Sequence, residues 1–477
     1  MTPPRSYTDQ RPLLDRGELT ATALVEYYLA QATQHAGLNA FLELFAQEAR
    51  TRAAALDAKP AHARGRLFGL VLAIKDNIVY RGHRAGASSK ILTGFESVFT
   101  ATALERLLAE DCIVLGRTNC DEFAMGSSNE NSAYGPVHNP HDPTRVSGGS
   151  SGGSTAAVAA GLCCAALGSD TGGSVRQPAA FCGVVGLKPS YGRVSRWGLI
   201  AYGSSFDQIG PLTASVDDAA LLLEVMAGPD PNDQTTAPTP YRPSATDGPK
   251  RIGILREALE SPGLQPEIKA ALEQTRDRLV AEGHRVELVD FPLLEVMVGV
   301  YYILTTAEAS SNLARFDGIR YGYRAEGELD LETLYARSRS EGFGPEVKRR
   351  ILLGTFVLSA GYYDAYYTQA MKVRRRIQEA TRALFAQYDF LLSPTTPSTA
   401  FRIGEKATDP IALYLADIFT VHANLAGIPG LSLPAGTDGQ GLPIGLQLMA
   451  DYLNDAELLA FARRLAPTLA SLTAHPA

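Results

Sequence analysis

Serine and lysine side chains occur in three stretches of the chain where they could carry out nucleophilic chemistry. Ser150 lies in the glycine- and serine-rich loop 148–154, Ser174 lies in a second such loop at 171–174, and Lys75 follows an apolar run. A serine hydroxyl becomes a useful nucleophile when a base takes its proton, and a lysine can be that base only when it is neutral. Burial can make it neutral, because moving a lysine pKa from about 10.4 towards about 7 corresponds to about 4 to 5 kcal/mol of desolvation.

Glycine-rich loops also suggest other kinds of site. A phosphate-binding loop would continue into Gly-Lys-Ser/Thr, or would follow a strand as Gly-x-Gly-x-x-Gly, and neither loop does so. Both Ser150 and Ser151 fit the Gly-x-Ser-x-Gly pattern of α/β-hydrolases, which needs a late histidine. The late histidines are His422, inside an apolar stretch typical of a packed core, and His475, close to the end of the sequence. The two patterns therefore favour neither nucleotide binding nor a hydrolase elbow.

The remaining combination of serines and a lysine leaves two interpretations of Lys75 open. At the end of an apolar strand it could be buried and act as a base, or it could form a surface ion pair with the adjacent Asp76. The residues alone favour neither interpretation over the other.

The elements around the two loops decide whether their serines can meet. The apolar run Ala156–Leu167 joins the loops, and its small residues predict a buried helix. Loops at the two ends of such a helix would lie apart, so shared chemistry requires the chain to fold back. Upstream, Leu70–Ile74 is a predicted buried strand, and the helix Ala101–Glu110 and strand Cys112–Leu115 complete a predicted parallel unit with it. Charged residues at the end of such a strand occupy the usual place of a site in an open α/β sheet.

Composition limits the class of protein. The chain has 477 residues and a formal net charge of -7, which argues against a surface of its own that binds nucleic acid. The five cysteines show no metal-ligand spacing and are expected to be buried thiols in a reducing compartment. The sequence shows neither the apolar segment of a secretory signal nor an apolar run of about 20 residues that could span a membrane. We therefore expect a cytoplasmic protein.

Three motifs, in this order, resemble the amidase signature family. They are LAIKDNI around Lys75, GGSSGGS around Ser150 and GSDTGGSVRQPAAFCGVVGLKPSYGRVS around Ser174. The resemblance implies an α/β fold with a large mixed β-sheet covered by α-helices on both sides. It implies one domain over residues 1–477, organised as follows: a catalytic core at about 65–212, a proline-rich surface loop at 228–250 and a C-terminal part, 251–477, that completes the sheet and the substrate pocket.

The same resemblance implies roles for the motif residues. The family's Ser-cisSer-Lys triad corresponds to Ser174 as the nucleophile, Ser150 as the bridging serine and Lys75 as the base. Backbone N–H groups of the second loop would bind the oxyanion, and they belong to Thr171, Gly172, Gly173 and Ser174. Glycines suit that role because no side chain blocks the approach of the substrate.

Further stretches are similar to the branch of the family that contains the glutaminase subunits of tRNA-dependent amidotransferases. They include TNCDEFAMGSSNENSAYGPVHNP, SRWGLIAYGSSFDQIGPLT and NLAGIPGLSLPAG. In that branch Arg350 would bind the α-carboxylate of glutamine, Asp417 would bind its α-ammonium group and Tyr301 would line the pocket. The sequence leaves open whether Arg349 or Arg350 faces the substrate. Backbone contacts are also expected from the stretch Met125, Gly126 and Ser127.

The resemblance implies a heterotrimer with B and C subunits. This chain would hydrolyse glutamine and pass ammonia to a partner that converts Glu-tRNA(Gln), Asp-tRNA(Asn) or both to the amidated forms. ATP and Mg²⁺ would bind at the partner subunit, which would also hold most of the tRNA, and this chain would carry no cofactor or metal. The alternatives are a free-standing amidase that hydrolyses another carboxamide and a catalytically idle scaffold.

Overall fold

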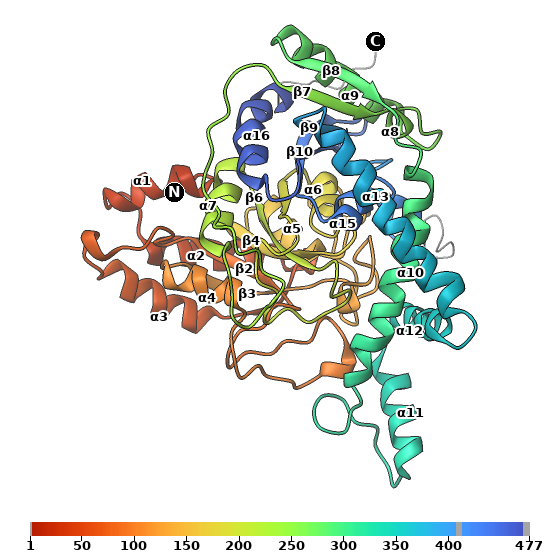
Figure 1. The fold of residues 1–477 in the computed structure, drawn as a ribbon. Helices are drawn as coiled ribbons and strands as arrows, with labels where there is room; N and C mark the ends of the chain where they lie inside the picture. The colour runs from red at the N-terminus through yellow and green to blue at the C-terminus, as the bar shows by residue number, and fades with distance from the viewer. Residues whose placement is uncertain (1, 407–412, 471–477) are drawn as a thin grey trace.

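The computed structural model describes residues 2–406 and 413–470, and an 11-stranded mixed sheet runs through its centre (Figure 1). The strand order is β1-β3-β2-β4-β6-β5-β10-β11-β9-β7-β8. The strands are β1 Phe41–Leu44, β2 Val71–Lys75, β3 Ile113–Thr118, β4 Ala165–Asp170, β5 Val185–Lys188, β6 Gln208–Thr213, β7 Arg251–Leu255, β8 Arg285–Val289, β9 Phe390–Pro394, β10 Gly430–Thr437 and β11 Pro443–Met449.

Helices cover both faces of this sheet (Figure 1). Helices α7 and α16 pack against each other over the middle strands, and α5 and α6 form a second packed pair. The helices are α1 Tyr7–Asp15, α2 Ala21–Gln34, α3 Ala46–Asp57, α4 Thr102–Ala109, α5 Gly152–Ala159, α6 Arg176–Cys182, α7 Val216–Met226, α8 Arg256–Leu259, α9 Pro266–Ala281, α10 Leu294–Asn312, α11 Leu331–Gly342, α12 Pro345–Leu358, α13 Gln369–Phe385, α15 Val421–Ala426 and α16 Asp455–Ala470.

Strand β2 lies between two parallel neighbours, β3 and β4. All five of its residues are buried, as expected for an apolar strand covered on both faces. The predicted parallel pairing with the strand after α4 is confirmed. Because β2 and β4 run in the same direction, their carboxyl ends, Lys75 and Asp170, lie at the same edge of the sheet.

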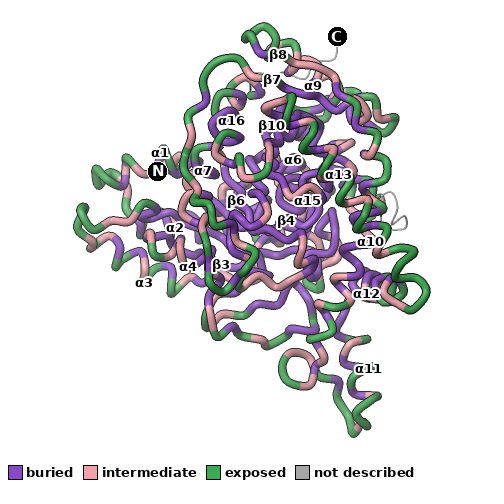
Figure 2. The backbone as a smooth tube through the Cα atoms, in the orientation of Figure 1, coloured by how far each residue is buried: buried purple, intermediate pink, exposed green. Residues whose placement is uncertain are grey.

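The main apolar core is continuous along the sheet. It contains side chains from α1 at one end of the sequence to α16 at the other, and Figure 2 shows buried backbone concentrated along the strands. Residues 228–250 form turns and irregular structure, and the chain returns to the same sheet at β7. Within the described ranges, no helix has both the length and the apolar character needed to cross a bilayer.

The prediction of one helix over Ala156–Leu167 is wrong. Helix α5 ends at Ala159, Gly161 adopts a left-handed φ of 68°, and the same apolar run continues as strand β4. Glycine takes this conformation without a steric cost, so it allows the chain to reverse. The reversal brings the loop before α5 and the loop after β4 to the same end of the unit.

Candidate active site

Lys75 is buried at the point where the two loops meet. Its side chain is 0 % exposed, and its Nζ lies 2.7 Å from the Oγ of Ser150 and 3.0 Å from the Oγ of Ser151. The Oγ of Ser169, on β4, lies 3.0 Å from the same nitrogen. These contacts exclude the surface interpretation of Lys75.

Asp76 forms its ion pair elsewhere. Its Oδ1 accepts a hydrogen bond from Arg117 at 2.6 Å, and its other oxygen accepts the backbone N–H of Ser88 at 2.7 Å. The carboxylate next to Lys75 in sequence is therefore neutralised by a different cation.

Burial lowers the pKa of Lys75 to about 8. Desolvation is the largest cause, because the charged ammonium loses water. The more distant carboxylates of Asp121, Asp170 and Asp207 act in the opposite direction and keep the pKa from falling further. Near neutral pH a useful fraction of this lysine is thus uncharged.

A hydrogen bond joins the two serine loops, because the N–H of Ser151 donates to the carbonyl of Ser174 at 3.1 Å. The carbonyl of Ser150 accepts the N–H of Asp121, outside both loops, at 3.2 Å. The peptide bond between Gly149 and Ser150 is cis. Ser174 is 7 % exposed, whereas Ser150 is fully buried, so Ser174 is the more accessible of the two hydroxyls.

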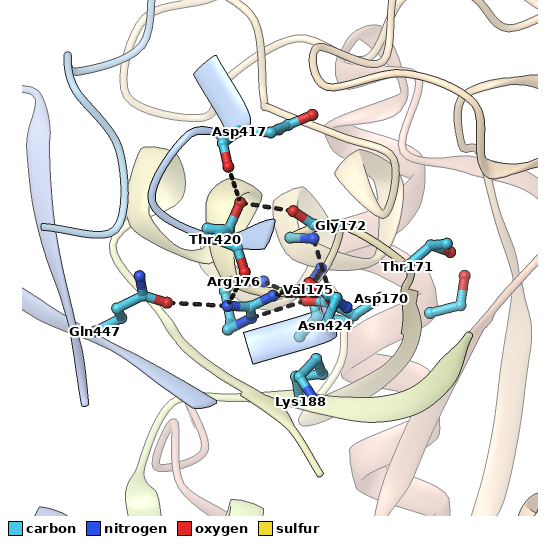
Figure 3. A network of polar contacts seen from close by, with 12 residues as sticks. Asp170, Thr171, Gly172, Val175, Arg176, Lys188, Asp417, Thr420, Asn424 and Gln447 are labelled. Carbon is cyan, nitrogen blue, oxygen red and sulfur yellow. Dashed lines mark hydrogen bonds and ion pairs between the residues drawn. The ribbon is translucent and has the colours of Figure 1, made fainter. Parts of the chain in front are cut away.

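The backbone of the second loop is fixed by three hydrogen bonds. The N–H of Gly173 donates to Asp170 at 2.9 Å, and the carbonyl of Gly173 accepts the N–H of Gln177 at 2.7 Å. The carbonyl of Gly172 accepts the hydroxyl of Thr420 at 2.6 Å (Figure 3). Among the described residues, no acceptor is found for the N–H groups of Thr171, Gly172 and Ser174.

Asp170 and Arg176 form a fully buried ion pair beneath this loop. Burial raises the pKa of Asp170, but the charge and hydrogen bonds of Arg176 outweigh it, and the pKa falls to about 2. The remaining donors of Arg176 reach partners on the C-terminal part of the chain, drawn in Figure 3: Thr420 O at 2.9 Å, Gln447 at 2.9 Å and Asn424 at 2.7 Å. Asp170 therefore stays ionised as part of the scaffold.

Arg350 is the arginine of α12 that faces inward. It is 2 % exposed, whereas the side chain of Arg349 is 48 % exposed. Arg350 bonds Glu346 at 2.8 Å and the hydroxyl of Tyr202 at 2.7 Å. Aromatic rings surround its guanidinium, with centroids at 5.1 to 5.5 Å: Tyr202, Tyr302 and Tyr414. Of the two arginines that the sequence left open, Arg350 is therefore the buried one.

Asp417, at the end of the short 3₁₀ helix η7 (Leu415–Asp417), is a buried carboxylate. It accepts hydrogen bonds from Ser127 at 2.7 Å and Tyr302 at 3.3 Å. No cationic side chain of the described residues pairs with it, and burial raises its pKa to about 7. A positively charged ligand group would compensate this carboxylate.

The other predicted pocket residues lie around these groups. Met125 is buried, and Gly126 packs so closely on Asp121 that an added Cβ would lie 2.3 Å from its carboxyl carbon. Tyr301 packs against Gly172 in the second loop. A cavity of about 420 Å³ is lined in part by Ser128 and by Tyr414, whose ring lies beside Arg350.

Sequence reasoning missed several residues of this site. Ser151 and Ser169 contact Lys75, Thr420 contacts Gly172 in the second loop, and Tyr302 contacts both Arg350 and Asp417. Of these residues, only Ser151 was indicated by the sequence, through its match to the Gly-x-Ser-x-Gly pattern. Within the described ranges, no group of three or more His, Cys, Asp or Glu side chains is arranged to hold a metal ion.

Comparisons with known proteins identify the family. A family model described as Amidase matches residues 23–459. The A subunit of glutamyl-tRNA(Gln) amidotransferase from Chlorobium luteolum is 52 % identical over 468 residues, which cover 96 % of each chain. Its counterpart from Chlorobaculum tepidum, which has the same name, is 50 % identical and covers 96 % of this chain and 97 % of its own.

Solved structures extend the comparison. The crystal structure of the A subunit of glutamyl-tRNA(Gln) amidotransferase from Thermotoga maritima has a TM-score of 0.76 at 40 % identity and covers 92 % of this chain and 90 % of that one. A 6-aminohexanoate cyclic dimer hydrolase complexed with substrate has a TM-score of 0.83 at 29 % identity and covers 97 % of both chains.

Proposed function

Because this chain belongs to the amidase family, we propose that it is the glutaminase subunit of a tRNA-dependent amidotransferase. The curated relatives at 50 to 52 % identity, with nearly complete coverage of both chains, carry the name of the A subunit of such an enzyme. The observation that carries the proposal is the pairing of a buried cation, Arg350, with a buried carboxylate, Asp417, across the ring of Tyr302. Glutamine presents one carboxylate and one ammonium group, which match that pair.

Lys75 acts as the base in the proposed mechanism. Ser151 donates its own hydroxyl proton to the carbonyl of Ser169 at 3.2 Å, so its oxygen is free to accept from Lys75. A neutral amine has two N–H groups and one lone pair. With the N–H groups directed to the oxygens of Ser151 and Ser169, the lone pair is left for the hydroxyl proton of Ser150.

The reaction follows from that orientation. Ser174 transfers its proton to Ser150, Ser150 transfers one to Lys75, and the Oγ of Ser174 attacks the carboxamide carbon. The N–H groups of Thr171, Gly172 and Ser174 bind the developing oxyanion. Gly173 was expected to share this role, but its N–H is engaged by Asp170, so we assign it to loop geometry. The relay returns a proton to the departing ammonia, and water then releases glutamate.

Binding of glutamine would stabilise the ionised form of Asp417. We assign the α-carboxylate to Arg350 and the α-ammonium group to Asp417, with Ser127 and Tyr302 holding the carboxylate of Asp417 in place. Met125 and Gly126 are assigned to the adjacent pocket wall, and Tyr301 to the side next to the nucleophile loop. An ammonium group beside a buried carboxylate favours its ionised form, so binding and ionisation support each other.

Ammonia has to reach a partner that consumes it. We propose that B and C subunits complete a heterotrimer, that the partner binds ATP and Mg²⁺, and that tRNA is held mainly there. The net charge of -7 supports this division, because phosphate binding needs clustered cations. We place the complex in the cytoplasm, where charged tRNA is used. An amidation assay with each charged tRNA decides whether Glu-tRNA, Asp-tRNA or both are the acceptors.

The test uses the chain co-purified with its partner subunits. Wild-type complex should release ammonia from glutamine and amidate Glu-tRNA or Asp-tRNA with glutamine and ATP. Ser174→Ala should lose both activities and should still amidate tRNA when ammonium salts are supplied, because only the ammonia source is removed. Ser97→Ala is a matched control, since the side chain of this buried serine bonds Phe99 and no other residue in the part of the chain that the structure describes. Undiminished glutamine hydrolysis by Ser174→Ala would refute the assignment.

A free-standing amidase is the second candidate, and the likeness to the cyclic dimer hydrolase favours it. The recognition pair separates the two functions. Replacing Arg350 or Asp417 with Ala should raise the KM for glutamine sharply if glutamine is the substrate. An unchanged KM for glutamine in both variants would favour an unrelated amide as the substrate.

A further inference from the structure

The turn from Asp417 to Thr420 connects the recognition pair, Arg350 and Asp417, with the nucleophile loop, residues 171–174. The N–H of Thr420 donates to the carbonyl of Asp417 at 3.0 Å, which closes one tight turn. The side chain of Asp417 accepts hydrogen bonds from Ser127 and Tyr302. The hydroxyl of Thr420 lies 2.6 Å from the carbonyl oxygen of Gly172 and 3.0 Å from that of Asp417 (Figure 3). The two ends of a single turn thus contact two different parts of the site.

Thr420 is packed directly on the nucleophile loop. It is 0 % exposed, and its Oγ1 lies 2.6 Å from the carbonyl oxygen of Gly172. A Cβ on Gly173 would lie 2.2 Å from that same Oγ1, so only glycine leaves room for this contact. Gly173 also has a φ of 136°, a region that suits glycine.

The contact fixes the direction of the loop's peptide planes. In a trans peptide the C=O and N–H point in opposite directions. Thr420 holds the C=O of the Gly172–Gly173 peptide while Asp170 holds its N–H, so this plane is held from both sides. The next plane is held through the carbonyl of Gly173 by the N–H of Gln177. The N–H of Ser174 belongs to the second of these planes, and the N–H of Gly172 belongs to the plane just before the first. Both N–H groups therefore take their direction from the fixed planes.

We propose that Thr420 is a positioning residue that holds the nucleophile loop in the form that binds the oxyanion, in register with the Asp417 carboxylate. The inference rests on the proposed function, because it assigns the Gly172 and Ser174 N–H groups to transition-state stabilisation. Thr420 does not touch the substrate in this scheme. Without its hydroxyl, the Gly172 carbonyl loses its donor and the loop can rotate away from the productive orientation.

The test compares two substitutions in the co-purified complex. Thr420→Val keeps the volume and removes the hydroxyl, and we expect it to lower kcat for glutamine by about 10- to 100-fold, below the full loss of an oxyanion donor. The KM for glutamine should stay within about twofold, because the recognition pair is intact. Thr420→Ser should recover kcat to within about threefold of wild type.

A matched control separates positioning from general destabilisation. Thr275→Val removes an equally buried hydroxyl on α9 that bonds only the carbonyl of Ala271. It should leave kcat unchanged while shifting the melting temperature about as much as Thr420→Val does. Wild-type kcat in Thr420→Val would overturn the proposal, and so would a loss shared equally by Thr420→Ser.

A second measurement keeps the inference testable if glutamine is not the substrate. A fluorophosphonate probe phosphonylates an activated serine: the Oγ–P bond forms, fluoride leaves, and the hydroxyl proton passes through Ser150 to Lys75. Labelling of wild type should require Ser174 and should be at least about tenfold slower in Thr420→Val. Equal labelling rates would overturn the role of Thr420, whereas failure of glutamine hydrolysis by wild type would overturn only the proposed function.

Discussion

The pH dependence of kcat tests the role of Lys75 directly. Burial lowers the pKa of Lys75 from 10.5 to about 8. At pH 7 a lysine with pKa of about 8 is neutral about one time in eleven, whereas one with pKa of about 10.5 would be neutral about three times in ten thousand. The shift therefore raises the concentration of active base by about 300-fold at neutral pH, which is the part of the catalysis that burial supplies.

The assay is ammonia release at saturating glutamine, so that kcat reports the enzyme–substrate complex. We expect kcat to rise about tenfold between pH 7 and a plateau above pH 9, with a midpoint near 8. Ammonium standards, read with the same coupling enzymes at each pH, control for the pH dependence of those enzymes. A flat kcat between pH 6.5 and 9, or a midpoint above pH 10, would refute the assignment of a buried neutral base.

The lowered pKa of Lys75 also makes the free energy of unfolding depend on pH. Below about pH 8 Lys75 is charged in both states, and the native state bears the full penalty of about 3 kcal/mol relative to high pH. Between about pH 8 and 10.5 the unfolded chain binds more protons than the native one, so this residue makes the free energy of unfolding rise with pH. A protein that buries this charge therefore gives up stability at neutral pH for reactivity.

Further predictions concern recognition and the nucleophile loop. Asp417→Asn should raise the KM for glutamine at least about tenfold and make the fall of kcat/KM below about pH 7 less steep, because only the protonation of Lys75 would still lower it, measured by initial rates. Arg350→Lys keeps the charge but not the planar fork, so the KM should rise about tenfold while kcat changes little. Gly172→Ala should abolish fluorophosphonate labelling, because its Cβ would lie 2.5 Å from the ring of Tyr301; Gly263→Ala, in open space, should have no effect.

The sequence predicted most elements near the site because their patterns are strong. The apolar run before Lys75 has the length and glycine boundary of a buried strand, and its parallel partner follows a clear helix. The run Ala156–Leu167 failed because small apolar residues buried on every side look the same in a helix and in a strand. A turn over residues 160–164, in which Gly161 has a positive φ, separates the two elements, and a glycine at that position is compatible with either prediction.

The orientation of charged side chains was harder to predict, since it depends on partners distant in sequence. Lys75 could be assigned to the interior only once Arg117 was known to neutralise Asp76. Arg350 differs from its neighbour Arg349 in that it bonds the hydroxyl of Tyr202, which lies about 150 positions earlier in the sequence. Such contacts follow from the order of strands in the sheet and leave no trace in local spacing.

Asp417 shows what the geometry adds to a motif. A buried carboxylate with hydroxyl donors but no cation is costly to ionise, and its pKa of about 7 records that cost. An amide with an α-ammonium group brings the missing charge, whereas an amide without one leaves the carboxylate unpaired. In the proposed role, the site would discriminate through the penalty on the wrong substrate as well as through attraction for the right one. Because Thr420 belongs to the same turn as Asp417, the group proposed to select the substrate and the group proposed to orient the Ser174 loop are parts of one turn.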